Sequence, residues 1–230
     1  SLIRNPIELE ENCKQLFKKE NNPLLISLVP TQLRRLIFHP AGIRWLQAFN
    51  LIWVGGSSMS IDIEKQARAQ NINLAPCYGS TETAAMITAL KPKDFLSGRN
   101  DCGHPLQDIE LKINTQGQLL VRTKRLAIGR WNDLRIEKIC DKNGWWKSGD
   151  IANLSKSSSK PKLKILGRID TAINSGGETI FPEILEKRLL DHVKSRNLPI
   201  EIIFLLPIND LEWGHRMVAL IRFKKEQINN

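Results

Sequence analysis

The hexapeptide Tyr78-Gly79-Ser80-Thr81-Glu82-Thr83 carries side chains that suit a nucleotide and a metal ion. The Tyr78 ring can stack on a purine, Gly79 permits a tight turn, and Thr81 can donate to a phosphate oxygen. Glu82 can ligate Mg²⁺, which prefers hard oxygen donors alongside phosphates. A polar turn whose Thr and Glu cap a helix is the structural alternative. The Tyr-Gly-x-Thr-Glu pattern favours the functional interpretation.

Three other segments with glycine have compatible chemistry. Gly55-Gly56-Ser57 ends an apolar strand, where glycines let a ligand approach the backbone closely. Asp150 follows Ser148-Gly149 and can accept both hydroxyls of a ribose. Arg168, two residues before Asp170, offers a planar donor fork for a ribose or a phosphate. Taken alone, each is equally compatible with a tight turn, a turn-stabilising aspartate or an interdomain linker.

A fourth segment, Ser175-Gly176-Gly177-Glu178, lies a few residues after Asp170. Together they are typical of a hinge followed by a flexible loop. A linker without any chemistry would have a similar composition, so these residues alone do not distinguish the two interpretations.

The elements that must position these side chains follow from the apolar runs. Up to Lys91, short apolar strands alternate with helices, which is typical of a parallel α/β sheet. The predicted strands in this part cover residues 24–29, 51–54 and 73–75, and the predicted helices cover 7–19, 31–37, 43–46 and 60–70.

After Lys91 the pattern changes, because strands separated by Gly, Asn-Gly and Lys-rich turns dominate. Strands at 109–113, 118–123 and 163–166 predict a small β-rich subdomain at about residues 100–166. A helix beginning at Pro182, followed by strands at 200–206 and 218–223, predicts a small α+β domain. We therefore expect two domains, residues 1–168 and 169–230.

The order of these motifs resembles that of the adenylate-forming superfamily of acyl-CoA synthetases, peptide-synthetase adenylation domains and luciferases. The resemblance runs from about Leu24 to Phe223. Residues 28–33 and 173–182 are similar to 2-succinylbenzoate–CoA ligases, although related acyl ligases share the second stretch. The resemblance implies the C-terminal part of a large AMP-binding domain, followed by a small, mobile and incomplete α+β domain.

Such enzymes activate a carboxylic acid with ATP and Mg²⁺ to give an acyl-adenylate, and CoA then displaces AMP. By resemblance, residues 55–57 border the adenine and acyl pocket, and Tyr78 stacks on adenine beside Gly79. Thr81 would bind the α-phosphate and Glu82 the Mg²⁺. Both belong to the catalytic machinery because catalysis rests on positioning and electrostatic stabilisation.

The later motifs also receive roles from the resemblance. Asp150 and Arg168 would bind the ribose, and Asp170 would be the hinge of the small domain. After that domain rotates, residues 175–178 would line the pantetheine tunnel of CoA. In the branch that this chain resembles, the acid is 2-succinylbenzoate and the pathway is menaquinone or phylloquinone biosynthesis.

Two parts of the family pattern are absent from these residues. The Ser/Thr/Gly-rich loop that cradles the β- and γ-phosphates is expected upstream of Ser1, and a late lysine is expected beyond Asn230. Losing a well-placed transition-state donor costs about 10²–10³ in rate. We therefore expect a fragment that adenylates poorly or not at all by itself but still binds AMP or an acyl-adenylate.

Other functions stay open. Within the class, the acid could be a fatty or aryl acid, and a carrier protein could replace CoA. A catalytically incomplete nucleotide-binding module is a further alternative. A nucleic-acid binder is suggested only by the net charge of +10. The basic residues are dispersed without an aromatic-interleaved stripe, so the sequence disfavours nucleic acid as a partner.

Composition places the chain among ordinary globular proteins, with 41% hydrophobic and 25% charged residues. No apolar run approaches the roughly 20 residues that cross a bilayer. The four cysteines lie far apart without a metal-ligand spacing, which predicts reduced thiols. Residues 1–12 are too acidic and too polar for a signal or transit peptide, so we expect a cytoplasmic protein. A homo-oligomer is compatible with the sequence, which leaves the oligomeric state open.

Overall fold

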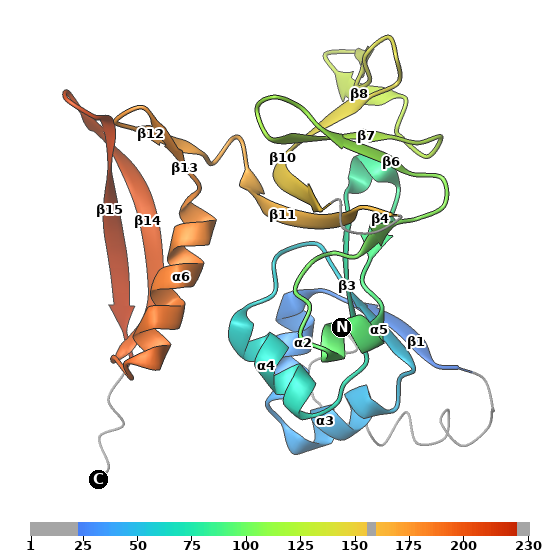
Figure 1. The fold of residues 1–230 in the computed structure, drawn as a ribbon, viewed down its shortest axis with the longest axis vertical. Helices are drawn as coiled ribbons and strands as arrows, with labels where there is room; N and C mark the ends of the chain where they lie inside the picture. The colour runs from blue at the N-terminus through green and yellow to red at the C-terminus, as the bar shows by residue number, and fades with distance from the viewer. Residues whose placement is uncertain (1–22, 156–159, 225–230) are drawn as a thin grey trace.

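A computed structural model describes residues 23–155 and 160–224, which form three consecutive parts (Figure 1). The first part is a five-stranded sheet in the order β1-β2-β3-β4-β5. The strands β1 to β3 are parallel, and β4 and β5 continue the sheet in antiparallel pairing. Their bounds are β1 Leu25–Leu28, β2 Leu51–Val54, β3 Leu74–Gly79, β4 Met86–Ala89 and β5 His104–Pro105.

Four helices accompany this sheet, and prolines begin three of them. The helices are α2 Pro30–Ile37, α3 Pro40–Gln47, α4 Ile61–Ala69 and α5 Pro92–Leu96, and a 3₁₀ turn, η1, spans Thr81–Thr83. Proline suits the first helical turn because a backbone N–H there has no partner within the helix, so its absence from proline costs no hydrogen bond. Leu33, Leu36 and Ile37 at helical spacing are fully buried and join the largest core cluster with Ile52 and Leu74.

The second part is a four-stranded antiparallel sheet in the order β11-β10-β7-β6. Its strands are β6 Glu110–Ile113, β7 Gln118–Arg122, β10 Trp146–Ser155 and β11 Lys162–Arg168. Leu119, Val121 and Leu163 are fully buried in the core beneath it. A hairpin formed by β8 Gly129–Asn132 and β9 Arg135–Lys138 projects from this sheet (Figure 1).

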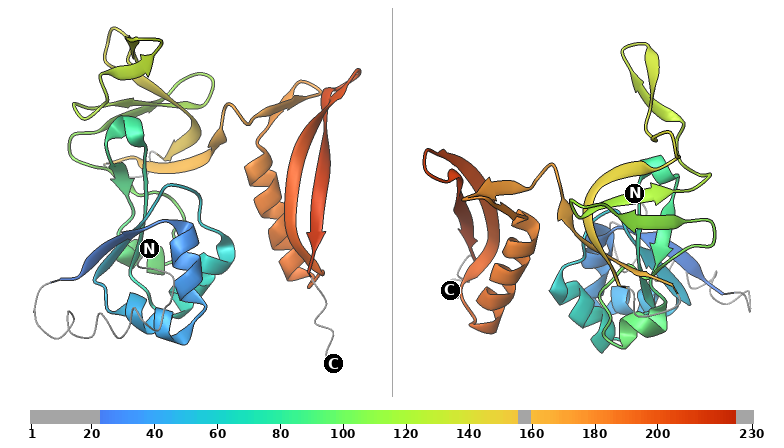
Figure 2. Two further views of the ribbon diagram at one scale, coloured as in Figure 1. Left: turned by 180° about the vertical axis from the view of Figure 1, so that it is seen from behind. Right: turned by 45° about the horizontal axis from the view of Figure 1, so that its top comes forward.

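The third part is a separate body beside the two sheets, as both views in Figure 2 show. It contains a hairpin of β12 Ile173–Ser175 and β13 Glu178–Ile180, the helix α6 Pro182–Ser195, and a hairpin of β14 Ile200–Asp210 and β15 Gly214–Phe223. Val193, Ile203 and Leu205 form its small core. Ion pairs from Lys187 to Glu64 and from Lys194 to Asp62 connect α6 with α4.

The α/β architecture expected from the sequence is confirmed. The strands predicted at 24–29, 51–54 and 73–75 correspond to β1, β2 and β3. The parallel pairing expected of them holds, but the sheet gains antiparallel strands beyond Gly79, because the chain folds straight back after the η1 turn. The helix predicted at 7–19 lies outside the described residues.

No helix among the described residues is both long enough and apolar enough to cross a membrane.

Candidate nucleotide-binding site

A cluster of three polar side chains joins the two sheets. The Tyr78 hydroxyl on β3 donates a hydrogen bond to Asp150 Oδ2 on β10. Arg168 Nη1, at the end of β11, lies 3.5 Å from Asp150 Oδ1. Asp150 and Arg168 are opposite each other in the β10–β11 register, which explains their proximity. The structure therefore brings together three of the residues that the sequence motifs singled out.

Local backbone geometry aims the Asp150 carboxylate toward this cluster. The pairing of β10 shifts register between Lys147 and Ile151, and Gly149 in that interval has φ +81°. The Ser148 hydroxyl donates to Leu119 O at 3.0 Å and accepts the Asp150 N–H at 3.1 Å. The turn expected before Asp150 is thus a β-bulge, which re-orients the side chain that follows it.

The electrostatics of the cluster keep the phenol of Tyr78 neutral. Burial raises the pKa of Tyr78 far above its usual range, and the hydrogen bond to Asp150 raises it further. A protonated phenol remains a donor, so it can hold the carboxylate in one orientation. The carboxylate keeps further lone pairs with which it can accept hydroxyl groups of a ligand.

A second cluster lies in the η1 turn, directly after Gly79. Thr83 is fully buried, and its hydroxyl accepts the Ser80 N–H at 2.9 Å and lies 2.7 Å from Ala85 O. Ala84 adopts a left-handed conformation with φ +61°. These contacts turn Thr81 outward, where it is exposed, and leave Glu82 partly exposed.

Glu82 has a partner that the sequence motifs did not indicate. Arg130 Nη2, on the β8–β9 hairpin, lies 2.6 Å from Glu82 Oε1. The hydrogen bond from Arg130 is the main cause of the lowered pKa of Glu82. The backbone reinforces the contact, because the Ala127 N–H donates to Glu82 O at 2.8 Å. Arg130 lies 48 residues from Glu82 in a polar segment, and no spacing pattern in the sequence links the two.

The Glu82 carboxylate fits a Mg²⁺ ion that also binds phosphates. Nowhere in residues 23–155 and 160–224 do three His, Cys, Asp or Glu side chains gather as a metal site. A single carboxylate such as Glu82 is enough for a Mg²⁺ ion whose other oxygen ligands come from phosphates and water. That arrangement is the usual one for Mg²⁺ in nucleotide sites.

Two motif glycines, Gly55 and Gly79, lie where other atoms approach the backbone closely. Val54 pairs with Pro76, so Gly55 follows β2 beside Cys77 at the carboxyl ends of the parallel strands. A Cβ on Gly55 would lie 2.8 Å from Cys77 Sγ, and one on Gly79 would lie 2.6 Å from Met86 Cα. Gly56 and Ser57 are exposed next to this edge. Ligands of open α/β sheets bind at such edges.

The remaining predicted residues lie toward or within the third part. Asp170 lies in the exposed linker after β11. Its carboxylate accepts hydrogen bonds from Nε and Nη2 of Arg168, each at 2.9 Å. Residues 175–178 form the tip of the β12–β13 hairpin, where the Gly176 N–H donates to Trp213 O at 3.0 Å. The hairpin packs on β15, and in Figure 1 it lies apart from β3 and β10, the strands that carry Tyr78 and Asp150.

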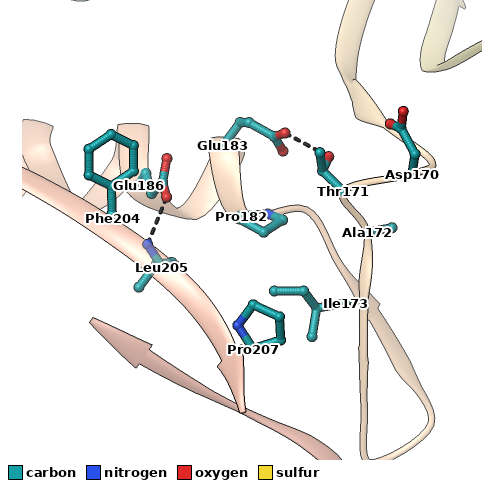
Figure 3. A pocket seen from close by; sticks show the side chains of 10 residues that line it. All are labelled: Asp170, Thr171, Ala172, Ile173, Pro182, Glu183, Glu186, Phe204, Leu205 and Pro207. Carbon is teal, nitrogen blue, oxygen red and sulfur yellow. Dashed lines mark hydrogen bonds between the residues drawn. The ribbon is translucent and has the colours of Figure 1, made fainter. Parts of the chain in front are cut away.

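A cavity of about 410 Å³ flanks the linker (Figure 3). Both glutamates on its wall already have partners. Glu183 Oε1 accepts the Thr171 hydroxyl at 2.7 Å, and Glu186 Oε1 accepts the Leu205 N–H at 2.7 Å. These bonds hold the linker and β14 against α6. The cavity therefore lies between the linker and the third part, and Asp170 on its wall pairs with Arg168 of the cluster.

Comparison with known proteins defines the class. The family model for AMP-binding enzymes matches residues 6–129, and the chain belongs to this family. The 2-succinylbenzoate–CoA ligase of Escherichia coli (strain K12) is 32% identical over 203 residues, which cover 88% of this chain and 41% of the relative. The ligase of the same name from Salmonella typhimurium (strain LT2) is 32% identical over 200 residues, covering 87% and 40%.

Solved structures agree with the fold. Escherichia coli MenE, bound to an m-phenylether-linked analogue of OSB-AMS, matches 98% of this chain and 45% of its own, with a TM-score of 0.70 and 29% identity. The o-succinylbenzoate CoA synthetase of Bacillus subtilis, in complex with OSB-AMP, matches 96% and 44% with a TM-score of 0.77. Because the sequence identity is only 23%, this similarity is evidence for the fold alone. The chain spans about two fifths of the length of the curated relatives that it matches.

Proposed function

We propose that this chain is the nucleotide-binding part of a 2-succinylbenzoate–CoA ligase, an AMP-forming enzyme of quinone biosynthesis. The observation that carries the proposal is the Tyr78–Asp150–Arg168 cluster, which β3, β10 and β11 bring together. Glu82 lies in the η1 turn that follows β3. Similarity to the enterobacterial ligases supports 2-succinylbenzoate as the acid, in preference to a fatty or aryl acid.

Each residue of the cluster has a physical task in this proposal. Asp150 accepts the ribose hydroxyls, and Arg168 adds a guanidinium donor on the same side. The Tyr78 ring packs against the base while its hydroxyl holds Asp150. Thr81, exposed at the η1 turn, donates to the α-phosphate. Glu82 holds Mg²⁺, which supplies positive charge to the phosphates. Acceleration then comes from orientation and electrostatic stabilisation, without a protein nucleophile.

We also propose that the third part is a small mobile domain, with domain limits at residues 1–168 and 169–230 and Asp170 at the hinge. Support comes from the exposed linker, in which Asp170 pairs with its near neighbour Arg168. The glycine-rich tip at residues 175–178 would reach the reacting centre and line the CoA path only after this domain rotates. The free thiols of Cys77, Cys102 and Cys140 suit a cytoplasmic location.

Calorimetric titration of the chain with AMP and with a non-hydrolysable succinylbenzoyl-adenylate analogue tests the function. The analogue should bind more tightly than AMP, and Asp150→Asn should weaken both by about tenfold or more, because a hydrogen-bonded charge is lost. Asp133→Asn removes the same charge at the exposed tip of the β8–β9 hairpin and should change neither affinity. The proposal would be contradicted if the wild type bound AMP and the analogue with equal affinity, or if Asp150→Asn left the binding of both unchanged.

A further inference from the structure

Arg130 has two carboxylates within its reach, on two different segments of the chain. Its Nη2 lies 2.6 Å from Glu82 Oε1 on the η1 turn. Glu137 is its direct cross-strand partner in the β8–β9 register, and both residues line a cavity of about 220 Å³. Side chains opposite each other on paired antiparallel strands lie close enough to form an ion pair. The cavity gives the guanidinium room to move from one carboxylate to the other.

The charges around the cavity explain why the guanidinium of Arg130 prefers the carboxylate on the η1 turn. Lys138 and Lys147 also line the cavity, so they repel a third cation there. Glu137 already has a cation nearby, because its Oε1 lies 3.8 Å from Arg135. The preference is small, because the Arg130 side chain is 67% exposed and exposed ion pairs contribute little to stability.

The ion pair neutralises Glu82 while no metal is bound. A carboxylate without a counter-ion beside the exposed Thr81 would repel the α-phosphate that we assign to that residue. Mg²⁺ brings two positive charges to the same carboxylate, and a guanidinium that stayed on Glu82 would repel it. The Glu82 side chain is 22% exposed, so the metal can reach it from solvent. Metal and guanidinium therefore compete for Glu82, and either one keeps the carboxylate compensated.

We propose that Arg130 is a positioning residue that acts through Glu82. It is the counter-ion of that carboxylate until Mg²⁺ binds, and it then passes to Glu137. Only the side chain moves, because the Ala127 N–H donates to Glu82 O at 2.8 Å and holds the base of the hairpin in place. This inference rests on the proposed nucleotide function.

Calorimetric titration of the full chain with AMP, without divalent metal, measures the first half of the exchange. Arg130→Gln should weaken AMP binding by about two- to fivefold, the range of an exposed ion pair, because Glu82 then repels the phosphate. The double variant with Arg130→Gln and Glu82→Gln should regain the wild-type affinity, because the repelling charge is gone. Lys142→Gln removes an exposed charge from the turn before β10 without lining the cavity, and it should leave AMP binding unchanged.

Titration of the AMP-saturated chain with Mn²⁺ measures the second half. Mn²⁺ takes the same oxygen ligands as Mg²⁺, and its electron paramagnetic resonance signal reports the free ion. Arg130→Gln should tighten metal binding by about two- to fivefold, because the competing cation is gone. Glu137→Gln should weaken metal binding by a similar factor, because Arg130 then has no second partner. In the Arg130→Gln background, Glu137→Gln should have no effect.

Each half of the exchange can fail separately. Weaker or unchanged metal binding in Arg130→Gln would show that the guanidinium does not compete with the metal and would overturn the inference. A loss of AMP affinity that persists in the double variant would indicate direct contact with the phosphate and would also overturn it. Unchanged metal binding in Glu137→Gln would overturn the move to that residue. A wild type that binds no AMP would instead refute the proposed nucleotide function.

Discussion

The Tyr78 hydroxyl donates to the Asp150 carboxylate across 72 residues of sequence, and this bond joins the mixed sheet of the first part to the antiparallel sheet of the second. The carboxylate also faces Arg168 at 3.5 Å, so it is held from two sides. A ligand that uses Asp150 therefore meets a carboxylate whose orientation is set before binding. Preorganisation of this kind lowers the entropic cost of association.

Replacing Tyr78 with Phe tests this orientation, because it removes the donor and keeps the ring. We expect AMP affinity to fall by about tenfold, because Asp150 loses one of its two restraints. The free energy of unfolding should fall by about 1–3 kcal/mol, because a part-buried acceptor loses its partner. Calorimetry with AMP and thermal unfolding measure the two effects. An unchanged AMP affinity would show that the phenol does not orient Asp150.

The ionisation of Tyr78 gives a pH-dependent prediction. Burial and the Asp150 carboxylate raise its pKa above the unfolded value of about 10. The neutral phenol therefore stabilises the fold fully below that value, and this contribution is lost as the pH rises further. Tyr78 is the only tyrosine in the chain, so absorbance reports its ionisation directly. We expect tyrosinate to appear only as the protein unfolds. Titration of the folded protein near the ordinary tyrosine value would contradict this expectation.

The motifs and much of the secondary structure could be predicted from the sequence because both depend on local pattern. The apolar run Leu51–Val54 is short and followed by glycines, and it is a buried parallel strand as expected. Pro182 begins α6 because proline is already suited to the first helical turn. Adjacent parallel strands then place Gly55 beside Cys77 by register alone.

The contacts between distant segments could not be predicted in the same way. The Arg130–Glu82 pair depends on the β8–β9 hairpin lying against the η1 turn, and no periodicity encodes that packing. The β-bulge before Asp150 depends on the pairing of β10 with β7. The roles assigned to the site residues and the domain limits at 168 and 169 remain predictions.

Gly79 provides a steric prediction for the site. Its φ is not in the left-handed region, but an added Cβ would lie 2.6 Å from Met86 Cα and closer still to Ala85 O. Gly79→Ala should therefore push the η1 turn outward, lower the free energy of unfolding by about 1–3 kcal/mol and weaken AMP binding. Thermal unfolding and calorimetry measure both effects.

Gly177→Ala is the matched control for Gly79→Ala. It has φ +83° with no atom within 4 Å of an added Cβ, so only backbone strain of about 1–2 kcal/mol applies. Its AMP affinity should equal that of the wild type, because it lies in the third part. A Gly79→Ala protein that binds AMP normally would show that the turn has room to adjust.

Ion pairs between α6 and α4 give the last prediction, which concerns the position of the third part. Lys194 Nζ lies 3.5 Å from Asp62 Oδ1, and Lys187 Nζ lies 3.8 Å from Glu64 Oε1. Burial opposes ionisation of Asp62, but hydrogen bonds from Ser60 and Arg34 and the charge of Lys194 outweigh it and lower the pKa to about 2. This depressed pKa means that the ionic contribution is present above the unfolded value of 3.8 and is lost as the pH falls toward 2.

Replacing both Lys187 and Lys194 with Gln should therefore loosen the third part while the Arg34–Asp62 pair stays intact. Limited proteolysis in the linker after Arg168 should accelerate by up to about fivefold, the range expected for exposed pairs. High salt should remove the difference from the wild type, because it screens the same pairs. Arg188→Gln, which removes an exposed charge from α6 without breaking either pair, should leave the cleavage rate unchanged. Equal cleavage of the double variant and the wild type at low salt would show that the two pairs do not hold α6 against α4.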